Sequence, residues 1–430
     1  MTQLLSARVG LLTPEMKQAA AAEGVDPEFI RAGIADGTIV LPKNRLRGNI
    51  RVCAIGRGLR TKVNALVGTS SDRDDPAMEA RKIEAAVAAG ADAIMDLSTG
   101  GDIDGMRRLS LEKAVVPVGS VPIYQAGIEA IERRGGIVQM EPEDMFAAIE
   151  KQAAAGVDFM AIHCALNFAV VERLQKTGRV TDIVSRGGAF LTGWMLHNRR
   201  ENPLYEQFDR VLAILKEYDV TLSLGDAIRP GCTADSLDGA QVQGLLVAGE
   251  LVARAREAGV QVMVEGPGHV PLHHVETTVL LQKRLCRGAP YFVLGTLATD
   301  VAPGYDHITA AVGGALAGAA GADFLCYVTP AEHLGLPTEE DVREGVYAAR
   351  VAAHAADIAK EVPGALERDR RMARARAAGD RRAQAELALN PEKVRRFLNG
   401  VEDGGYCRLC GDDCALRLAA EYFQGGPVAE

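Results

Sequence analysis

Short apolar segments alternate with longer Ala-rich ones from about residue 60 to residue 335. The apolar segments end in Gly, Asp, Ser or His and have the length of buried strands, whereas the longer segments between them have the length of helices. Helices are predicted over segments that include 76–89, 142–155, 205–218 and 240–258. The strand candidates are 62–67, 93–97, 116–121, 158–163, 181–185, 220–224, 261–265, 291–294 and 323–328.

Strand–helix alternation over this length predicts parallel strands, and closure into a (β/α)8 barrel is the favoured architecture. Nine strand candidates are one more than such a barrel needs, so one of them is expected to lie outside it. An open, doubly wound sheet is the alternative α/β fold. No Gly-x-Gly-x-x-Gly follows the first strand, which argues against a dinucleotide site.

Residues 1–60 are predicted to form a small N-terminal α+β unit. Helices are expected to begin at Thr13-Pro14 and at Asp26-Pro27, because a capping side chain followed by proline favours a helix start. Segments 38–42 and 50–52 are expected to form the strands of a short hairpin.

The rest of the chain is expected to form three regions that differ in composition. Residues 61–337 are expected to form the catalytic barrel, 338–400 a region of charged helices, and 401–430 a Gly-rich, flexible arm. The Arg-rich stretch 368–382 is interpreted as a solvated helix face, and a docking face for an acidic partner is the alternative.

Composition and charge narrow the possible partners. The 430 residues carry a net charge of −9, which argues against nucleic acid or a membrane surface as the main partner. No window resembles a signal peptide or a membrane span. Eight cysteines without a secretory signal indicate a reducing, cytoplasmic setting in which thiols bind metals.

Three of these cysteines, Cys407, Cys410 and Cys414, lie close together in the spacing C-x2-C-x3-C. Thiolates this close can converge on one soft metal centre. A closed structural zinc site takes four ligands, and no His or further Cys follows. A 4Fe-4S cluster with one open iron is therefore favoured. A zinc site completed from elsewhere and a redox thiol pair are the alternatives.

Polar residues follow nearly every predicted strand, and in a barrel the carboxyl ends of the strands face the active site. Singly, His163 is explained equally well as a core histidine and Asp226 as a helix cap. Turns alone would not need a His, an acid or an Arg at nearly every position, so the set predicts a functional site. Its members include Asp96, Tyr124, His163, Ser185, Arg186, Gly187, Asp226, Arg229, Glu265, His269 and His333.

Roles for these residues follow from their chemistry. The turn Ser185-Arg186-Gly187-Gly188 offers N–H groups, a hydroxyl and a guanidinium, which suit a phosphate; a plain strand-to-helix turn is the alternative. His269 and His333 are candidate ligands of one divalent ion with open positions. Asp226, Arg229 and Glu265 can hold polar groups of a heterocycle or sugar, or move protons.

Several long motifs give the sequence a specific resemblance, from about residue 1 to residue 420, to the phosphomethylpyrimidine synthase family of thiamine biosynthesis. The motifs are Met95–Asp102, Val121–Gln125, Ser185–Gly188, Glu265–His269 and Ala302–His307, together with the cysteine arm. The resemblance implies a non-standard radical S-adenosylmethionine lyase. Reductive cleavage of that cofactor gives a 5′-deoxyadenosyl radical, which abstracts hydrogen from the ribose of aminoimidazole ribonucleotide.

The same resemblance implies roles for individual residues. Cys407, Cys410 and Cys414 would hold the 4Fe-4S cluster, and His269 and His333 a zinc-type ion. It also implies a homodimer in which the arm of one subunit reaches the barrel of the other, and a reductant such as a flavodoxin or ferredoxin. The implied substrate contacts are Met95, Tyr124, His163, Ser185, Gly187, Asp226, Arg229 and Glu265, to which Arg186 is added from the phosphate-type turn.

Departures from the family pattern bear on the product. Leu66 stands where Asn is usual, Ala227 and Ile228 replace Gly and Leu, and the order Tyr291-Phe292 reverses the usual Phe-Tyr. Losing a polar contact weakens recognition of a polar group by on the order of 1–3 kcal/mol. A sister branch, the anaerobic 5-hydroxybenzimidazole synthases, converts the same ribonucleotide into the lower-ligand base of cobalamin.

That branch is the favoured interpretation, and synthesis of hydroxymethylpyrimidine phosphate for thiamine is the alternative. A non-catalytic iron–sulfur scaffold protein and a non-radical metal-dependent hydrolase are the more remote hypotheses.

Overall fold

The computed structural model describes residues 1–48, 50–398 and 413–423. The chain divides into two compact units, Met1–Lys360 and Glu361–Glu430. The second unit contains α16 (Ala365–Ala377), α17 (Arg381–Leu387), α18 (Pro391–Leu398) and α19 (Ala415–Phe423). Within the described residues, no helix is both long and apolar enough to cross a membrane.

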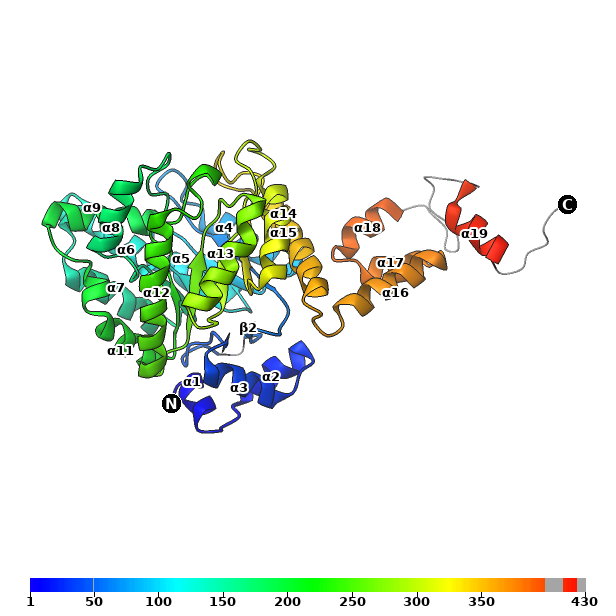
Figure 1. Cartoon of the computed structure of the whole chain (residues 1–430), viewed down its shortest axis with the longest axis horizontal. Coiled ribbons are helices and arrows are strands. Elements are labelled where there is room, and N and C mark those ends of the chain that lie inside the picture. The colour runs from blue at the N-terminus through cyan, green and yellow to red at the C-terminus, as the bar shows by residue number, and fades with distance from the viewer. Residues whose placement is uncertain (49, 399–412, 424–430) are drawn as a thin grey trace. The chain divides into compact units, whose positions relative to one another are not determined.

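The first unit is built around a closed barrel of parallel strands (Figure 1). Neighbours around the barrel follow the order β10-β3-β4-β5-β6-β7-β8-β9, so the predicted (β/α)8 fold class is confirmed. The strands are β3 (Lys62–Val67), β4 (Ala93–Asp96), β5 (Val118–Ser120), β6 (Phe159–Ile162), β7 (Thr221–Leu224), β8 (Val262–Gly266), β9 (Tyr291–Leu294) and β10 (Phe324–Cys326).

Aromatic side chains contact one another among these strands. The rings of Phe292 and Phe324 stack with centroids 4.3 Å apart, and Phe159 lies edge-on to Phe324 at 6.2 Å. Gly119 makes room for this packing, because a Cβ there would lie 2.3 Å from the Phe159 ring. Large apolar side chains buried together in this way supply much of the stability of a barrel core.

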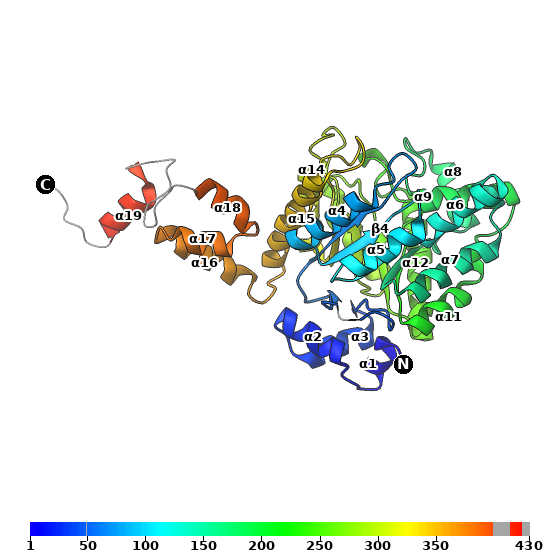
Figure 2. The ribbon, with the colours of Figure 1, turned by 180° about the vertical axis from the view of Figure 1, so that it is seen from behind.

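Helices surround the strands on the outside, as Figure 2 shows from behind. The helices predicted over 76–89 and 142–155 are confirmed, and the predicted 240–258 helix begins one residue earlier. The segment 205–218 is interrupted at Gln207, which separates α10 from α11. The helices are α4 (Pro76–Ala89), α5 (Ile103–Lys113), α6 (Pro122–Arg134), α7 (Pro142–Ala155), α8 (Phe168–Thr177), α9 (Arg186–Asn198), α10 (Pro203–Glu206), α11 (Phe208–Tyr218), α12 (Gly239–Ala258), α13 (Leu272–Leu285), α14 (Asp306–Ala320) and α15 (Glu339–Ala359).

The predicted strand 181–185 is wrong, and it is the surplus one of the nine candidates. Its residues form an irregular loop between α8 and α9. The N–H groups of Val180 and Thr181 donate to the carboxylate of Asp235 at 2.9 and 3.0 Å. A side chain therefore takes the hydrogen bonds that a neighbouring strand would otherwise accept.

The N-terminal unit has the predicted helix starts. In α2 (Pro14–Glu23) the hydroxyl of Thr13 accepts from the N–H of Met16, and in α3 (Pro27–Asp36) Asp26 accepts from the N–H of Glu28. Both helices have proline in the first turn, where its missing N–H costs nothing.

The hairpin differs from its prediction. Strand β1 (Ile39–Val40) pairs antiparallel with β2 (Ile55–Gly56), not with residues 50–52. The N–H of Arg51 donates instead to the carbonyl of Val115 at 2.7 Å. A tertiary hydrogen bond has thus replaced the local pairing that the sequence pattern favoured.

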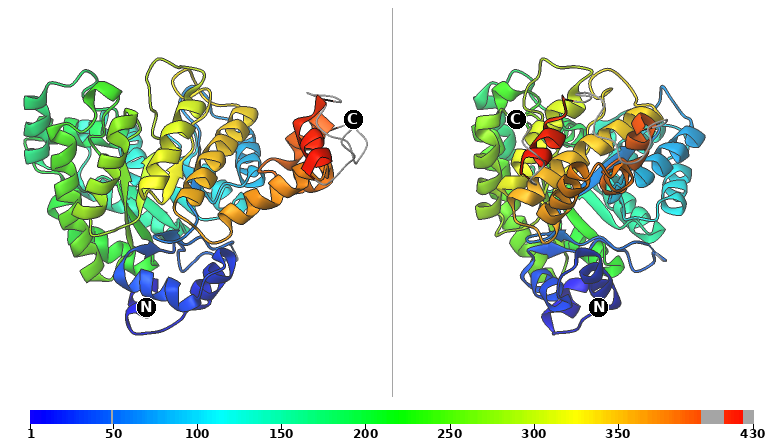
Figure 3. Two further views of the ribbon diagram at one scale, coloured as in Figure 1. Left: turned by 45° about the vertical axis from the view of Figure 1, so that its right-hand side comes forward. Right: turned by 90° about the vertical axis from the view of Figure 1, so that its right-hand side faces the viewer.

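The N-terminal unit covers the amino ends of the barrel strands, as both views of Figure 3 show. The N–H of Gln3 in α1 (Gln3–Arg8) donates to Asp219 at 3.0 Å, just before β7. Lys62, which is 1% exposed, pairs with Glu23 at 3.1 Å. The barrel is closed at this end, so its opposite rim is left for chemistry.

Asn44 links the N-terminal unit to the barrel, and its replacement by alanine tests that link. Its side-chain amide donates to the carbonyls of Ala153 and Val157 at 2.7 and 3.0 Å, and the residue is fully buried. Asn44→Ala would leave both carbonyls without this donor. We expect a loss of about 2–3 kcal/mol in the free energy of unfolding.

Chemical denaturation of the two proteins measures this effect. The matched control is Asn198→Ala, which removes two similar amide bonds at an exposed position and should cost under about 1 kcal/mol. Equal losses in the two variants would contradict the proposed anchoring role.

Candidate functional site

A cavity of about 580 Å³ opens at the carboxyl ends of the barrel strands. Part of its wall is polar or charged and part is apolar. The polar residues include Thr69, Ser70, Lys82, Thr99, Tyr124, His163, Arg186, Arg229, Glu265, His269, Thr329, Glu332 and His333. The apolar residues include Leu66, Met95, Leu97, Leu294, Leu297, Val328 and Leu336.

Most of the predicted site residues meet at this cavity. Those that line it are Met95, Tyr124, His163, Arg186, Arg229, Glu265, His269 and His333. Ser185 and Gly187 lie against His163: the Ser185 hydroxyl is 3.3 Å from His163 Nε2, and a Cβ on Gly187 would be 2.4 Å from that ring. Asp226 lines a separate cavity of about 30 Å³.

The predicted cluster ligands fall in the second unit. Cys407 and Cys410 lie outside the described residues. Cys414 is described, and it is a buried, free cysteine directly before α19.

The turn before α9 is built to present backbone N–H groups. The Ser185 hydroxyl caps the helix by accepting from the N–H of Gly188 at 3.2 Å. A Cβ on Gly188 would lie 1.7 Å from the carbonyl oxygen of Ala227, so only glycine permits this approach. Arg186 extends over the Tyr124 ring, 5.1 Å from its centroid. A helix start with an adjacent guanidinium suits an anion such as a phosphate.

Burial sets the protonation of the ionisable groups at this rim. It raises the pKa of Glu265 to about 7, although the charge of Arg229 opposes the shift and Ser223 donates to the carboxyl at 3.1 Å. Burial likewise raises the pKa of Asp226 to about 6, again against Arg229. For His163, burial and the charge of Arg229 both lower the pKa, to about 3. His163 is therefore neutral near pH 7.

Each of the two candidate metal histidines is oriented by a carboxylate. His269 Nδ1 lies 2.7 Å from Asp300, His333 Nδ1 lies 2.9 Å from Asp306, and the two ring centroids are 5.4 Å apart. This arrangement occupies both Nδ1 atoms and leaves both Nε2 atoms for another partner, as in metal-binding histidines with a supporting carboxylate. The donor set therefore fits a divalent ion.

Two ligands do not complete a metal site. The described part of the chain contains no group of three or more His, Cys, Asp or Glu suited to a metal. The sequence patterns had not singled out Asp300 or Asp306. Asp306 lies inside the motif Ala302–His307, which is the only signal that pointed towards it.

The positions that depart from the family pattern divide between the two faces of the barrel wall. Leu66 lines the cavity beside its register partner Met95. Phe292 pairs in register with Glu265 and stacks on Phe324. Tyr291 lines the small cavity with Asp226 instead. Reversing Tyr and Phe thus moves a hydroxyl to the other face of β9.

The raised pKa of Glu265 predicts a pH-dependent contribution to stability. Between pH 4.5 and about 7 the folded protein keeps a proton that the unfolded chain has released. This contribution to the free energy of unfolding is roughly 3 kcal/mol. It is fully present below pH 4.5 and is lost as the pH rises through about 7. The Glu265→Gln variant does not show this loss, because a glutamine side chain does not titrate.

The free energy of unfolding of Glu265→Gln should therefore rise relative to wild type over this pH range and level off above it. Denaturation curves at several pH values measure the difference, with the exposed Glu132→Gln as the control. A difference that does not change with pH would be inconsistent with a buried, protonated Glu265.

Comparison with known proteins identifies relatives along nearly the whole chain. It is 72% identical to the 5-hydroxybenzimidazole synthase BzaB of Moorella thermoacetica, with 98% of this chain and 99% of that protein covered. It is 60% identical to the phosphomethylpyrimidine synthase of the same organism (98% of each chain) and 58% identical to the BzaB of Eubacterium limosum (98% and 99%).

A family model described as the Radical SAM ThiC family matches residues 2–421. Membership implies S-adenosylmethionine and an iron–sulfur cluster as cofactors. Together with the polar rim of the barrel, the match shows that this chain belongs to the Radical SAM ThiC family and is a radical S-adenosylmethionine enzyme.

Proposed function

We propose that the protein is a 5-hydroxybenzimidazole synthase, a lyase that rearranges aminoimidazole ribonucleotide into the lower-ligand base of cobalamin. The observation that carries the proposal is the 72% identity, over nearly the full length of both chains, to a protein of that name. The apolar residues Leu66 and Phe292 support it, because they replace polar residues of the pyrimidine synthases.

Synthesis of hydroxymethylpyrimidine phosphate is the second candidate. The chain is 60% identical to a phosphomethylpyrimidine synthase, and Tyr124, Arg229 and Glu265 line a cavity that would also suit the ribonucleotide of that reaction. Both candidates share the substrate and the cofactors, so they differ only in the fate of the ribonucleotide.

The polar rim would hold the ribonucleotide at both ends. The N–H groups and hydroxyl of the Ser185 turn would bind its phosphate together with Arg186, whose guanidinium lies over the Tyr124 ring. Arg229 and Glu265 would hold the polar groups of the imidazole and ribose. With a pKa of about 7, Glu265 can either accept or donate a proton there.

The cofactors are proposed from the donors that the chain supplies. Cys407, Cys410 and Cys414 would hold a 4Fe-4S cluster, leaving one iron for S-adenosylmethionine. Together these cofactors would supply the radical that removes hydrogen from the ribose. The chain's own task is to orient the ribonucleotide and to exclude water and other reactants from the cavity.

The metal and the partners complete the proposal. His269 and His333 would bind one divalent ion, zinc or a similar ion, with Asp300 and Asp306 holding the rings in place. By the family resemblance, we also propose a cytoplasmic homodimer that receives electrons from a flavodoxin- or ferredoxin-type protein.

An anaerobic assay with product analysis tests the proposed function. The cluster is reconstituted, and the protein is supplied with S-adenosylmethionine, a reductant and aminoimidazole ribonucleotide. We expect 5-hydroxybenzimidazole by mass spectrometry, and we expect a triple Cys→Ser variant of Cys407, Cys410 and Cys414 to yield none. Hydroxymethylpyrimidine phosphate as the product would establish the second candidate instead.

Metal content tests the histidine pair separately from turnover. The triple Cys→Ser variant, loaded with Zn²⁺ and desalted, should retain about one ion per chain, and adding His269→Gln should abolish this retention. The matched control is the exposed His273→Gln, which should leave the zinc content unchanged. Zinc that persists after both His269 and His333 are replaced would refute the assignment.

A further inference from the structure

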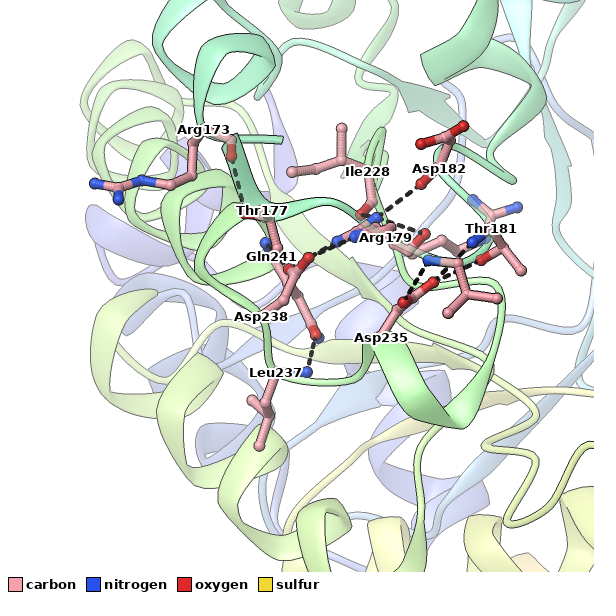
Figure 4. A network of polar contacts seen from close by, with 12 residues as sticks. Arg173, Thr177, Arg179, Thr181, Asp182, Ile228, Asp235, Leu237, Asp238 and Gln241 are labelled. Carbon is pink, nitrogen blue, oxygen red and sulfur yellow. Dashed lines mark hydrogen bonds and ion pairs between the residues drawn. The ribbon is translucent and has the colours of Figure 1, made fainter. Parts of the chain in front are cut away.

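Two loops at the rim of the cavity are joined by a network of polar contacts (Figure 4). The first loop, residues 178–185, leads into the Ser185 turn. The second, residues 225–238, carries Asp226 and Arg229 and leads into α12. Arg179 belongs to the first loop, and its side chain, which has a relative exposure of 0%, reaches across to the second. A buried guanidinium is costly unless its donors are satisfied.

The guanidinium of Arg179 bonds to both loops at once. Its Nε and Nη2 donate to the two carboxylate oxygens of Asp238, at 2.6 and 2.8 Å. Its Nη1 donates to the carbonyl of Ile228 at 2.6 Å and to that of Asp182 at 3.1 Å. A lysine offers no planar fork of donors and cannot reproduce this set.

Asp235 ties the loops together in the opposite direction. Its carboxylate, on the second loop, accepts from the N–H groups of Val180 and Thr181 and from the Thr181 hydroxyl, at 2.9–3.0 Å. Each loop thus contributes a charged side chain that binds the other loop. The two loops are therefore connected by side chains from both of them.

Both loops also contain a strained residue next to these contacts. Asp182 has φ +43° and Leu237 has φ +59°, a region that residues other than glycine occupy at a cost and only where their surroundings fix it. The carbonyl of Asp182 is held by Arg179, and the N–H of Leu237 donates to Gln241 at 2.7 Å.

The backbone of the two connected loops carries the candidate substrate contacts. Ile228, whose carbonyl accepts from Arg179, directly precedes Arg229, which lines the cavity. Ser185, at the end of the first loop, lies against His163. A shift of one loop relative to the other would therefore change the separation between Arg229 and the Ser185 turn.

We propose that Arg179 is a positioning residue that fixes this separation, so that the phosphate and the ring of one ribonucleotide are bound together. Arg179 touches neither group itself and acts through Ile228 and the 178–185 loop. The inference rests on the proposed function for the identity of the ligand. The network that carries it is independent of that function.

Two variants test the proposal in the reconstituted enzyme. Arg179→Lys keeps the charge but loses the fork, and Asp238→Asn keeps a side chain that can cap α12, where Asp238 now accepts from Gln241. In both we expect KM for aminoimidazole ribonucleotide to rise about tenfold or more, with kcat within about threefold of wild type. The control is Arg210→Lys, since Arg210 makes a similar two-pronged pair with Glu143 on the exposed surface.

The outcomes separate this inference from the proposed function. Unchanged KM in both folded variants would overturn it, and so would an equal fall of kcat with unchanged KM. If the wild-type protein does not bind the ribonucleotide in calorimetry, the proposed function fails. Amide hydrogen exchange then tests whether Arg179 fixes the two loops relative to each other. Exchange in 180–188 and 226–230 should be faster in Arg179→Lys than in Arg210→Lys, and equal exchange would overturn the positioning role.

Discussion

Closure of the barrel is the constraint on which the rest of the structure depends. Each parallel strand is hydrogen-bonded on both sides, so no edge is left open, and every strand delivers its carboxyl end to the same rim. Residues as far apart in sequence as Leu66 and His333 therefore line one cavity. The N-terminal unit occupies the opposite end, where the buried pair of Glu23 and Lys62 lies.

Arg229 is the charge that the ionisable groups of this rim have in common. It acts on Glu265, Asp226 and His163, in each case alongside a larger effect of burial. It favours the charged form of both carboxyls and the neutral form of the imidazole. The position of this one side chain thus influences proton occupancy across the site.

The barrel was predictable from the sequence, because strand-length and helix-length segments alternate many times. Each repeat of this alternation supports the same fold. The prediction failed where tertiary hydrogen bonds replaced regular strand pairing. Residues 181–185 have the composition of a strand, but the carboxylate of Asp235 accepts from the N–H of Thr181 and from that of Val180 just before the segment. The N–H of Arg51 likewise donates to the carbonyl of Val115 rather than to a hairpin partner. No local sequence pattern predicts a hydrogen bond to a residue more than 50 positions away.

For the site, most of the residues predicted from the strand ends do line the cavity. Their supporting partners were not predictable, because Asp300, Asp306 and Arg179 lie outside the strand ends and gain their roles only through tertiary contacts. Asp226 was predicted as a substrate contact, and it lines a smaller cavity beside Tyr291 that shares Glu265 with the large one. The direction of a side chain at a loop depends on the path of that loop, which the sequence pattern does not specify.

The central claim is that the cavity directs radical chemistry to the ribose of aminoimidazole ribonucleotide. Anaerobic turnover with ribonucleotide deuterated on the ribose, followed by mass spectrometry of the 5′-deoxyadenosine formed, tests it most directly. The account predicts that deuterium appears in the 5′-deoxyadenosine. Formation of 5′-deoxyadenosine without deuterium, from ribonucleotide labelled at every ribose carbon-bound position, would contradict it.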